Sequence, residues 1–172
     1  MNSIATVIDF LSKHKLRLVT AESCTAGMVT SLLADAPGCA SVLDVGYVTY
    51  TENAKNRCLG VAYQTIASFG LTSEEVAYEM AVGALERSEA DVAIAITGTA
   101  ESNDELNGVV CFAYAARIEN AIRTFSETVK FEGERNTVRK SAAEHVICSI
   151  PANYEKFIRG EGNNSQNIFS VV

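Results

Sequence analysis

The chain has 172 residues, of which 48% are hydrophobic and 20% are charged, and this composition excludes an intrinsically disordered chain. The net charge of -7 argues against a general nucleic-acid-binding protein, because such proteins neutralise phosphates with a surplus of Lys and Arg. A small phosphorylated ligand stays compatible, since it needs only one or two local cations. We expect a single domain over residues 1–159 and a flexible tail over residues 160–172, where Gly, Asn and Ser are frequent.

The cysteines and the apolar runs bear on metal sites and on the cellular compartment. The five cysteines are odd in number, widely spaced and free of any Cys-x-x-Cys pair, and there are only two histidines. This pattern predicts reduced thiols, with neither disulfides nor a zinc site. The first ten residues do not resemble a signal peptide, and no apolar stretch approaches the roughly 18 residues of a membrane span. We therefore expect a cytoplasmic protein that does not bind membranes.

Taken in chain order, the hydrophobic spacing predicts alternating helices and strands, which is typical of a layered α/β fold. The nearly continuous apolar run at 91–97 predicts a central strand that is buried on both faces. Strands are expected at residues 16–21, 42–51, 91–97, 108–116 and 121–131, the last two paired as a hairpin or meander, and helices at 4–11, 28–36, 53–59, 64–69, 74–87 and 134–149.

Local signals set the expected ends of several helices. Thr25 is the predicted N-cap of the helix at 28–36, which Pro37–Gly38 ends. Thr72 and Glu75 predict a capping box for the helix at 74–87. Pro151 is expected to kink or end the helix at 134–149.

The first candidate site is the sharp junction between the strand at 16–21 and the following helix. Such junctions expose a side chain at the carboxyl edge of a sheet and aim backbone N–H groups at a ligand. The hydroxyl of Ser23 could attack a carbonyl there, while backbone N–H groups of Cys24 to Gly27 hold the oxyanion. The alternative is that Ser23 and Thr25 only cap the helix. Cys24 is a rival nucleophile, although a small buried residue is its more ordinary role.

A serine nucleophile needs a base, and the histidines are poorly placed for that task. Both are predicted on helix faces away from the strand ends, so a Ser-His-Asp triad is not favoured. Lysine can replace histidine where its surroundings keep it neutral. Lys55 follows a strand and opens a helix, so it could face the same sheet edge as Ser23, or it could be a solvated surface lysine.

Two further segments could contribute to a site. Arg135 and Arg139 lie four residues apart near a helix start, where they could bind a phosphate or carboxylate or pair with surface acids. Thr97 and Gly98 end the buried strand, the position at which α/β sites form. The loop 99–107 that follows carries three carboxylates, which could suggest a metal, but its polar character favours a solvated surface loop.

Together these segments resemble the CinA C-terminal family. The resemblance rests on Thr20-Ala21-Glu22-Ser23-Cys24-Thr25, Pro37-Gly38, Gly46-Tyr47-Val48-Thr49-Tyr50, Ala54-Lys55, Leu59-Gly60-Val61, Ser73-Glu74-Glu75-Val76, Ala90-Asp91-Val92-Ala93, Thr97-Gly98 and Gly133-Glu134-Arg135, which keep the family's order and spacing. It implies a three-layer α/β/α sandwich with a mixed, mostly parallel sheet, assembled as a homo-oligomer.

The resemblance also implies an activity and roles for individual residues. Family members include amidases that convert nicotinamide mononucleotide to nicotinate mononucleotide and ammonia, without a metal or another cofactor. Ser23 matches the family's nucleophile and Lys55 its general base. Tyr50 would line the substrate pocket with Thr25, Thr97 and Gly98, and Arg135 or Arg139 would bind the nucleotide phosphate. The predicted oxyanion donors are the backbone N–H groups of Cys24 and Gly27.

The sequence departs from the family pattern at three places. The loop after Gly98 lacks the family's glycine- and proline-rich segment and gains negative charge, which would repel a phosphorylated ligand if it pointed inward. Glu52-Asn53 replaces the usual Asn-Glu beside Lys55, and is expected to shift the pKa of that amine. Ala26 replaces a favoured glycine and restricts the backbone. Two alternatives therefore stay open: an amidase for another small amide, and a catalytically idle member that binds a nucleotide or a partner protein.

Overall fold

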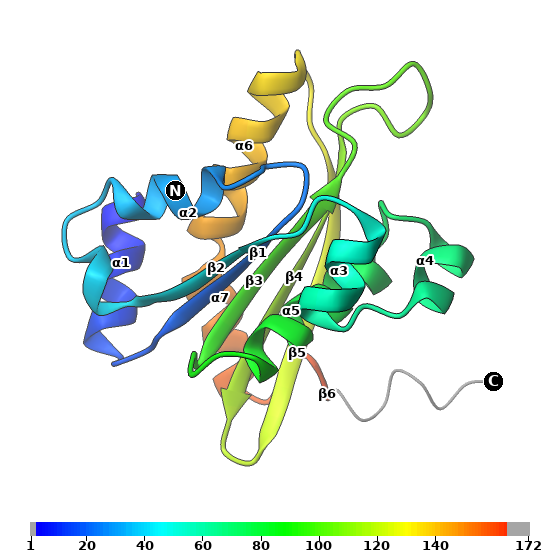
Figure 1. The fold of residues 1–172 in the computed structure, drawn as a ribbon. Coiled ribbons are helices and arrows are strands. Elements are labelled where there is room, and N and C mark those ends of the chain that lie inside the picture. Colours follow the sequence, from blue (N-terminus) through cyan, green and yellow to red (C-terminus); the bar gives the residue numbers. More distant parts are fainter. Residues whose placement is uncertain (1–2, 165–172) are drawn as a thin grey trace.

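The structure is a computed structural model that describes residues 3–164 (Figure 1). It confirms the predicted alternation of elements, with shifts of a few residues at their ends. The strands are β1 (Leu18–Glu22), β2 (Leu43–Val48), β3 (Val92–Gly98), β4 (Val109–Ile118), β5 (Ala121–Lys130) and β6 (Asn163–Asn164). The helices are α1 (Ile4–Lys13), α2 (Met28–Ala34), α3 (Glu52–Leu59), α4 (Tyr63–Phe69), α5 (Glu74–Glu86), α6 (Arg135–Cys148) and α7 (Ile150–Ile158), with a 3-10 turn at Cys39–Ser41.

The strands form one mixed sheet in the order β2-β1-β3-β4-β5-β6. β1 is parallel to β2 and to β3, whereas β3–β4, β4–β5 and β5–β6 are antiparallel. The sheet is mixed, as expected, but antiparallel pairings outnumber parallel ones by three to two, so the expectation of a mostly parallel sheet was wrong in this respect. The reason lies in the connections, because those that follow β3 and β4 are too short to hold a crossover helix.

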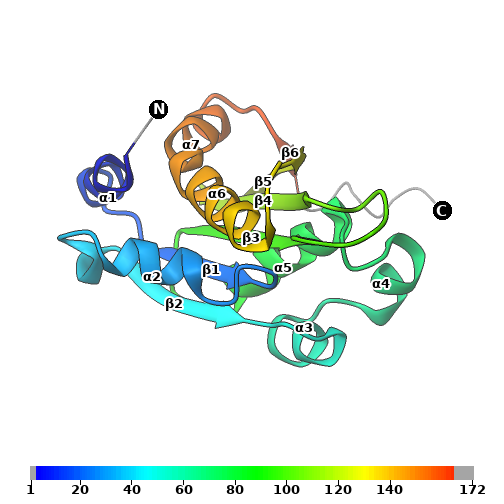
Figure 2. The same ribbon diagram turned by 90° about the horizontal axis from the view of Figure 1, so that it is seen from above.

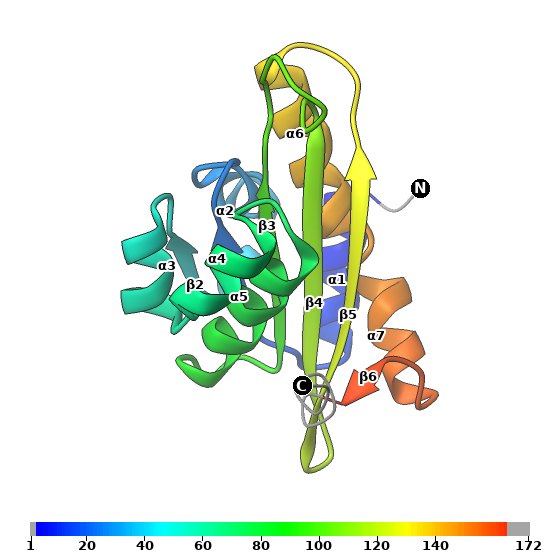
Figure 3. The ribbon, with the colours of Figure 1, turned by 90° about the vertical axis from the view of Figure 1, so that its right-hand side faces the viewer.

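Helices cover both faces of the sheet, which confirms the three-layer α/β/α arrangement. One core cluster joins α1, α2, α6 and α7 to the sheet, and a second joins α3, α4 and α5 to its opposite face. Figure 3 shows the long strands β4 and β5 between α3, α4 and α5 on one side and α6 and α7 on the other, and Figure 2 shows the layers from above. None of the helices within residues 3–164 is long and apolar enough to cross a membrane.

Side-chain size differs between the two faces of β3, the strand at the centre of the sheet. Its larger residues, Val92, Ile94 and Ile96, belong to the first core, whereas Ala93 and Ala95 face the second. β3 is buried on both faces over residues 92–97, as its apolar run predicted. Because small residues line the second face, α5 can pack close to the sheet with its own alanines.

Several predicted helix ends were displaced. Gly27, and not Thr25, is the N-cap of α2, because a left-handed turn at Ala26 and Gly27 delays the helix. Ser73, and not Thr72, caps α5, since its hydroxyl accepts from the N–H of Val76.

The helix predicted at 134–149 ends just before Pro151, as expected, but a further helix that was not predicted follows it. α6 ends at Cys148, and Pro151 lies in the first turn of a separate helix, α7. Within the predicted tail, Asn163–Asn164 pair with β5, and residues 165–172 lie outside the described part of the chain.

The close packing of α5 makes a testable prediction at Gly83. A Cβ atom there would lie 1.8 Å from the backbone oxygen of Leu59 at the end of α3. Replacing a helical glycine by alanine normally stabilises a helix by about 1 kcal/mol. Here we expect Gly83→Ala to lower the free energy of unfolding by about 1–3 kcal/mol, since the two helices must move apart. Urea unfolding would measure this, with the exposed Glu86→Ala as control; a gain in stability at Gly83 would contradict the packing.

Candidate active site

The predicted nucleophile lies in a tight turn at the carboxyl end of β1. Hydrogen bonds extend the sheet just past the strand, since Ser23 N–H donates to Ile96 O at 3.0 Å and Thr49 N–H donates to Glu22 O at 2.8 Å. The chain then turns through Ala26 and Gly27, both with positive φ (51° and 93°), before α2 begins. The turn lies near the upper edge of the sheet in Figure 1, close to the β3–β4 loop and α6.

A buried carboxylate anchors this turn. The Glu22 side chain is fully buried, and its Oε2 accepts from the N–H groups of Gly27 at 2.8 Å and Val29 at 3.1 Å. Its Oε1 accepts from the N–H and the hydroxyl of Thr30, at 2.9 and 2.8 Å. A carboxylate at a helix N-terminus satisfies N–H groups that have no partner inside the helix, so Glu22 fixes α2 against the end of β1.

Glu22 was not among the residues predicted to have a role in the site. The available signal was a Glu at the end of a buried apolar strand, directly before the turn. Buried carboxylates are rare unless they are paired or hydrogen-bonded, so hydrogen-bond donors around the Glu22 side chain could have been predicted from this position.

Lys55 reaches the turn from the other side of the sheet edge. Thr51 caps α3 by accepting from the N–H of Ala54, and this places Lys55 in the helix's first turns. Its side chain is only 1% exposed, and its Nζ donates to Ser23 Oγ and to Thr49 O, both at 2.7 Å. Ser23 itself is 7% exposed. The structure thus brings the two predicted catalytic side chains into direct contact, and Lys55 is not a solvated surface lysine.

Burial shifts the pKa values of Lys55 and Cys24 in opposite directions. Desolvation lowers the pKa of Lys55 to about 8, and the nearby charge of Glu52 acts in the opposite direction. The departure at Glu52 therefore does act on the amine, as expected. Desolvation also raises the pKa of Cys24 to about 11. Cys24 is therefore a protonated thiol at neutral pH, which disfavours it as the nucleophile.

The two arginines of α6 differ in their surroundings. Arg139 Nε donates to Cys24 O at 3.0 Å, its Nη2 to Thr25 O at 2.9 Å and its Nη1 to Asn136 Oδ1 at 3.0 Å. Arg135 is exposed, and its Nη2 donates to the hydroxyl of Tyr50 at 3.3 Å. Arg139 is therefore held against the turn that follows Ser23, whereas Arg135 and the half-exposed Tyr50 face solvent.

The remaining predicted site residues are less available to a ligand. The hydroxyl oxygen of Thr25 is buried beside the Ser23–Lys55 pair and has no hydrogen-bond partner within residues 3–164, and the same holds for Thr49, which was not among the predicted site residues. Thr97 Oγ1 donates to Leu71 O at 2.8 Å, and Gly98 pairs with Val110 at the end of β3. These two residues hold the sheet edge in place.

One predicted oxyanion donor is already occupied. The N–H of Gly27 donates to Glu22, so it is not free for a substrate oxygen. In contrast, the N–H of Cys24 is not paired with any backbone carbonyl in the described part of the chain, and the same holds for Thr25. The structure thus contradicts Gly27 as a donor, whereas no backbone carbonyl within residues 3–164 occupies the N–H of Cys24.

The loop 99–107 is ordered by its own hydrogen bonds. Asp104 Oδ1 accepts from the Ser102 hydroxyl at 2.6 Å and from the Leu106 N–H at 3.0 Å, and these bonds lower the pKa of the carboxyl. Thr99 bonds to Thr72 through their hydroxyls at 2.9 Å. The acidic side chains of Glu101, Asp104 and Glu105 are exposed, as expected for a solvated loop.

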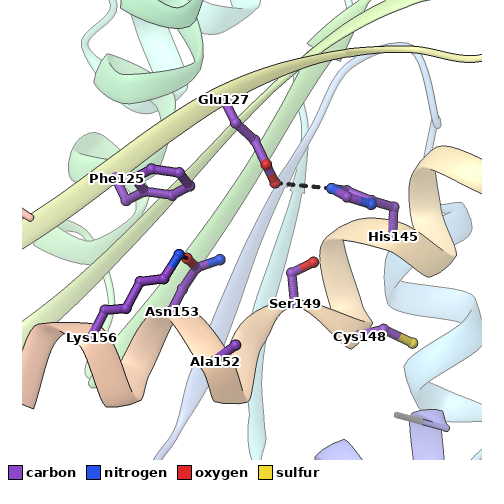
Figure 4. Close-up of a pocket in the computed structure, with 8 residues that line it drawn as sticks. All are labelled: Phe125, Glu127, His145, Cys148, Ser149, Ala152, Asn153 and Lys156. Atoms are coloured by element: carbon purple, nitrogen blue, oxygen red, sulfur yellow. Dashed lines mark hydrogen bonds and ion pairs between the residues drawn. The ribbon is translucent and has the colours of Figure 1, made fainter. Parts of the chain in front are cut away.

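A separate cavity of about 320 Å³ lies between β5 and the α6–α7 junction (Figure 4). His145 points into it and contacts Glu127 Oε1 through Nε2 at 2.9 Å, and this bond lowers the pKa of Glu127. His145 is thus bound to a carboxylate away from Ser23, which agrees with its exclusion as the base. Across residues 3–164, no group of three or more His, Cys, Asp and Glu side chains is arranged to hold a metal ion.

Comparison with known proteins identifies relatives along most of the chain. A sequence profile described as CinA C-terminal domain matches residues 2–153. A putative competence-damage inducible protein of Symbiobacterium thermophilum is 39% identical over 149 residues, which are 81% of this chain and 35% of that protein. A nicotinamide-nucleotide amidohydrolase, PncC, of Shigella flexneri is 38% identical over 137 residues, covering 77% of this chain and 81% of that protein. The chain thus spans about a third of the first of these relatives.

Solved structures share the fold. The crystal structure of a competence/damage inducible protein from Agrobacterium tumefaciens is 33% identical, with a TM-score of 0.81, and covers 87% of this chain and 92% of its own. A competence damage-inducible protein from Klebsiella pneumoniae is 30% identical, with a TM-score of 0.80, and covers 93% of this chain and 100% of its own. These matches agree with the observed α/β sandwich.

The anchoring role of Glu22 can be tested by its isosteric amide. In Glu22→Gln, one acceptor oxygen becomes an NH₂ group that faces two donors, so we expect the free energy of unfolding to fall by about 2–4 kcal/mol. Glu132→Gln, on an exposed side chain, should change it by no more than about 0.5 kcal/mol. Equal losses in both variants, measured by urea unfolding, would contradict the anchor.

The depressed pKa of Lys55 predicts a pH dependence of stability. Between pH 8 and 10.5 the unfolded chain binds this proton and the folded chain does not, so the stability linked to Lys55 is full above pH 10.5 and is lost as the pH falls towards 8. Lys55→Met removes this term. We expect the free energy of unfolding of the variant, minus that of the parent chain, to be about 2 kcal/mol larger at pH 7 than at pH 10.

Urea unfolding at the two pH values would measure this difference. Lys140→Met, at an exposed position on α6, is the control and should show no such change. A pH-independent difference between the parent and Lys55→Met would contradict a desolvated amine.

Proposed function

We propose an activity for this chain, which belongs to the CinA C-terminal domain family: it hydrolyses the carboxamide of nicotinamide mononucleotide to nicotinate mononucleotide and ammonia. The observation that carries the proposal is the buried 2.7 Å contact between Ser23 Oγ and Lys55 Nζ. Support also comes from the printed name of the Shigella flexneri relative, a nicotinamide-nucleotide amidohydrolase. We further infer that the protein works in the cytoplasm and as a homo-oligomer.

The proposed reaction begins with proton transfer between the two side chains. With Lys55 neutral, its lone pair accepts the Ser23 hydroxyl proton over the 2.7 Å contact while Oγ attacks the carboxamide carbon. The C–N bond then breaks, and the ammonium of Lys55 returns the proton to the departing NH₂ group, which leaves as ammonia. Water attacks the acyl-enzyme, gives a proton to Lys55 and releases the carboxylic acid, and Ser23 regains its proton.

Burial makes lysine suitable for this task. An exposed lysine is almost fully protonated at neutral pH, whereas an amine with a pKa of about 8 is neutral in a useful fraction of molecules. The carbonyl of Thr49 accepts from the amine at 2.7 Å and directs the rest of the group towards Ser23. Lys55 is therefore oriented towards Ser23, and at neutral pH it is neutral in a fraction of the molecules.

Substrate recognition is assigned to the outer residues of the site. Among residues 3–164, Arg135 has only a 3.3 Å contact with the Tyr50 hydroxyl, so its guanidinium is available to a phosphate. Tyr50 is 54% exposed, and its ring offers a surface for an aromatic substrate ring.

The loop 99–107 favours one second candidate, an amidase for a different small amide. Its carboxylates at Glu101, Asp104 and Glu105 are exposed and follow directly on β3, whose end borders the site. An uncharged or cationic amide would meet less repulsion from this loop than a phosphorylated one. Parallel assays with simple aromatic amides would distinguish the two candidates.

The amidase is tested by ammonia release from nicotinamide mononucleotide. We expect release by the parent chain and a loss of at least about 10³-fold in kcat for Ser23→Ala and for Lys55→Ala, because the two side chains act as one unit. Ser41→Ala and Lys140→Ala, at exposed positions, should retain activity. Release that survives Ser23→Ala would overturn the nucleophile, and an inactive parent chain would overturn the substrate.

The pH profile tests the base separately. Since Lys55 must be neutral, we expect kcat/KM to rise with pH and to level off above an apparent pKa of about 8. Glu52→Gln removes a negative charge that raises the pKa of Lys55, so in this variant the increase of kcat/KM should occur at lower pH. An identical profile in Glu52→Gln, or a profile flat between pH 6 and 9 in the parent, would argue against Lys55 as the base.

A further inference from the structure

We infer that Arg139 is a positioning residue that holds the oxyanion-binding turn, and that the N–H of Thr25 joins the N–H of Cys24 as the pair of oxyanion donors. This inference rests on the proposed amidase function and deepens it. It reassigns Arg139, which the resemblance offers as a phosphate ligand, and it replaces Gly27, whose N–H is occupied by Glu22.

The contacts of Arg139 point to the turn and not to a ligand. All three guanidinium nitrogens donate to protein oxygens, two of them to the consecutive carbonyls of Cys24 and Thr25. Asn136, one turn earlier on α6, holds the third nitrogen and so fixes the plane of the group. A planar fork that bridges two neighbouring carbonyls restricts both peptide units at once.

The direction of these carbonyls determines where the N–H groups point. In a trans peptide, the C=O of one residue and the N–H of the next point in opposite directions. Because Arg139 draws Cys24 O towards α6, the N–H of Thr25 is turned to the opposite side of the turn. Ala26 N–H donates to Ser23 O at 3.0 Å, which fixes the adjoining Ser23–Cys24 peptide and its N–H.

The backbone N–H groups of the turn differ in whether they have an acceptor. Around the turn, the N–H groups of Ser23, Ala26 and Gly27 have acceptors, whereas those of Cys24 and Thr25 have no backbone carbonyl partner within the described residues. Two adjacent N–H groups that donate to no backbone carbonyl, directly after a serine in contact with a buried amine, suit the oxyanion that forms when Ser23 attacks a carbonyl.

Glu22 and Arg139 thus hold opposite sides of one turn. Glu22 binds N–H groups at the start of α2, and Arg139 binds carbonyls between Ser23 and α2. Ala26 has a positive φ of 51°, a conformation that an alanine adopts only when its surroundings impose it. The two side chains supply such surroundings, and they keep the donors in place before the substrate binds.

The decisive experiment measures kcat and KM of Arg139→Gln and Arg135→Gln with two substrates, one with and one without the phosphate. Arg139→Gln should lower kcat by about 10- to 100-fold and leave KM within about threefold, with nicotinamide mononucleotide and equally with the riboside that lacks the phosphate. Arg135→Gln should instead raise KM for the mononucleotide and leave the riboside unchanged. Lys140→Gln, the exposed neighbour of Arg139, is the matched control and should behave as the parent chain.

The opposite split would overturn the inference. If Arg139→Gln raised KM for the mononucleotide with an unchanged kcat, and if the riboside showed no defect, Arg139 would be a phosphate ligand. Arg139→Lys tests the bridging geometry, because one ammonium cannot reproduce the planar fork, and full activity in this variant would also count against the inference. Thermal unfolding of each variant identifies any loss of activity that is due to unfolding.

A measurement without substrate separates this inference from the proposed function. Amide hydrogen exchange across residues 22–27 should be faster in Arg139→Gln than in Lys140→Gln, because the turn loses two hydrogen bonds. Equal exchange would overturn the positioning role, whatever the substrate is. Faster exchange in a chain that releases no ammonia would support the positioning role and reject only the mononucleotide.

Discussion

The contact between Lys55 Nζ and Ser23 Oγ is the interaction on which the architecture of the site depends. It joins α3, on one face of the sheet, to the turn that leads into α2 on the other face. The contact forms because β1 and β2 are parallel neighbours, so that their carboxyl ends lie at one edge. A short connection after β2 then brings α3 back over this edge, and the side chain of Lys55 reaches inward. The rest of the site holds the two ends of this contact at a fixed distance.

Holding an amine at this position acts against stability at neutral pH. Lys55 loses almost all contact with water, and its two recorded partners are the carbonyl of Thr49 and the hydroxyl of Ser23, neither of which is an anion. A salt bridge with a nearby carboxylate would stabilise the charged form and raise the pKa, which would remove the base. Glu22 is the buried carboxylate of this region, and its oxygens are directed to donors of α2. The separation of the buried acid from the buried amine allows the amine to lose its proton, as the proposed role of Lys55 as a base requires.

Much of the fold and part of the site followed from the sequence, for local reasons. The strand–turn–helix at Ser23 and the strand–helix at Lys55 are short-range patterns, and parallel strands bring their ends together. The roles of Glu22 and Arg139 depended on side-chain directions that no local pattern specifies. Arg139 meets Cys24 across 115 positions of sequence. The share of antiparallel pairing was underestimated because apolar runs indicate burial and give no strand direction.

Arg135 and Arg139 show why spacing alone could not assign the roles of this helix. Four residues apart, they lie on one face, and the family resemblance implied that one or the other binds the nucleotide phosphate. One helical turn displaces Arg135 by about 6 Å along the axis, enough to move it from the packed turn to the solvent-facing rim beside Tyr50. The guanidinium of Arg139 is therefore occupied by hydrogen bonds within the protein, and of the two arginines Arg135 is the one that could attract a phosphate. The carboxylates of the loop 99–107 are exposed, so solvent weakens their repulsion of a phosphate without removing it, and Arg135 is the group on this helix that could offset the remainder.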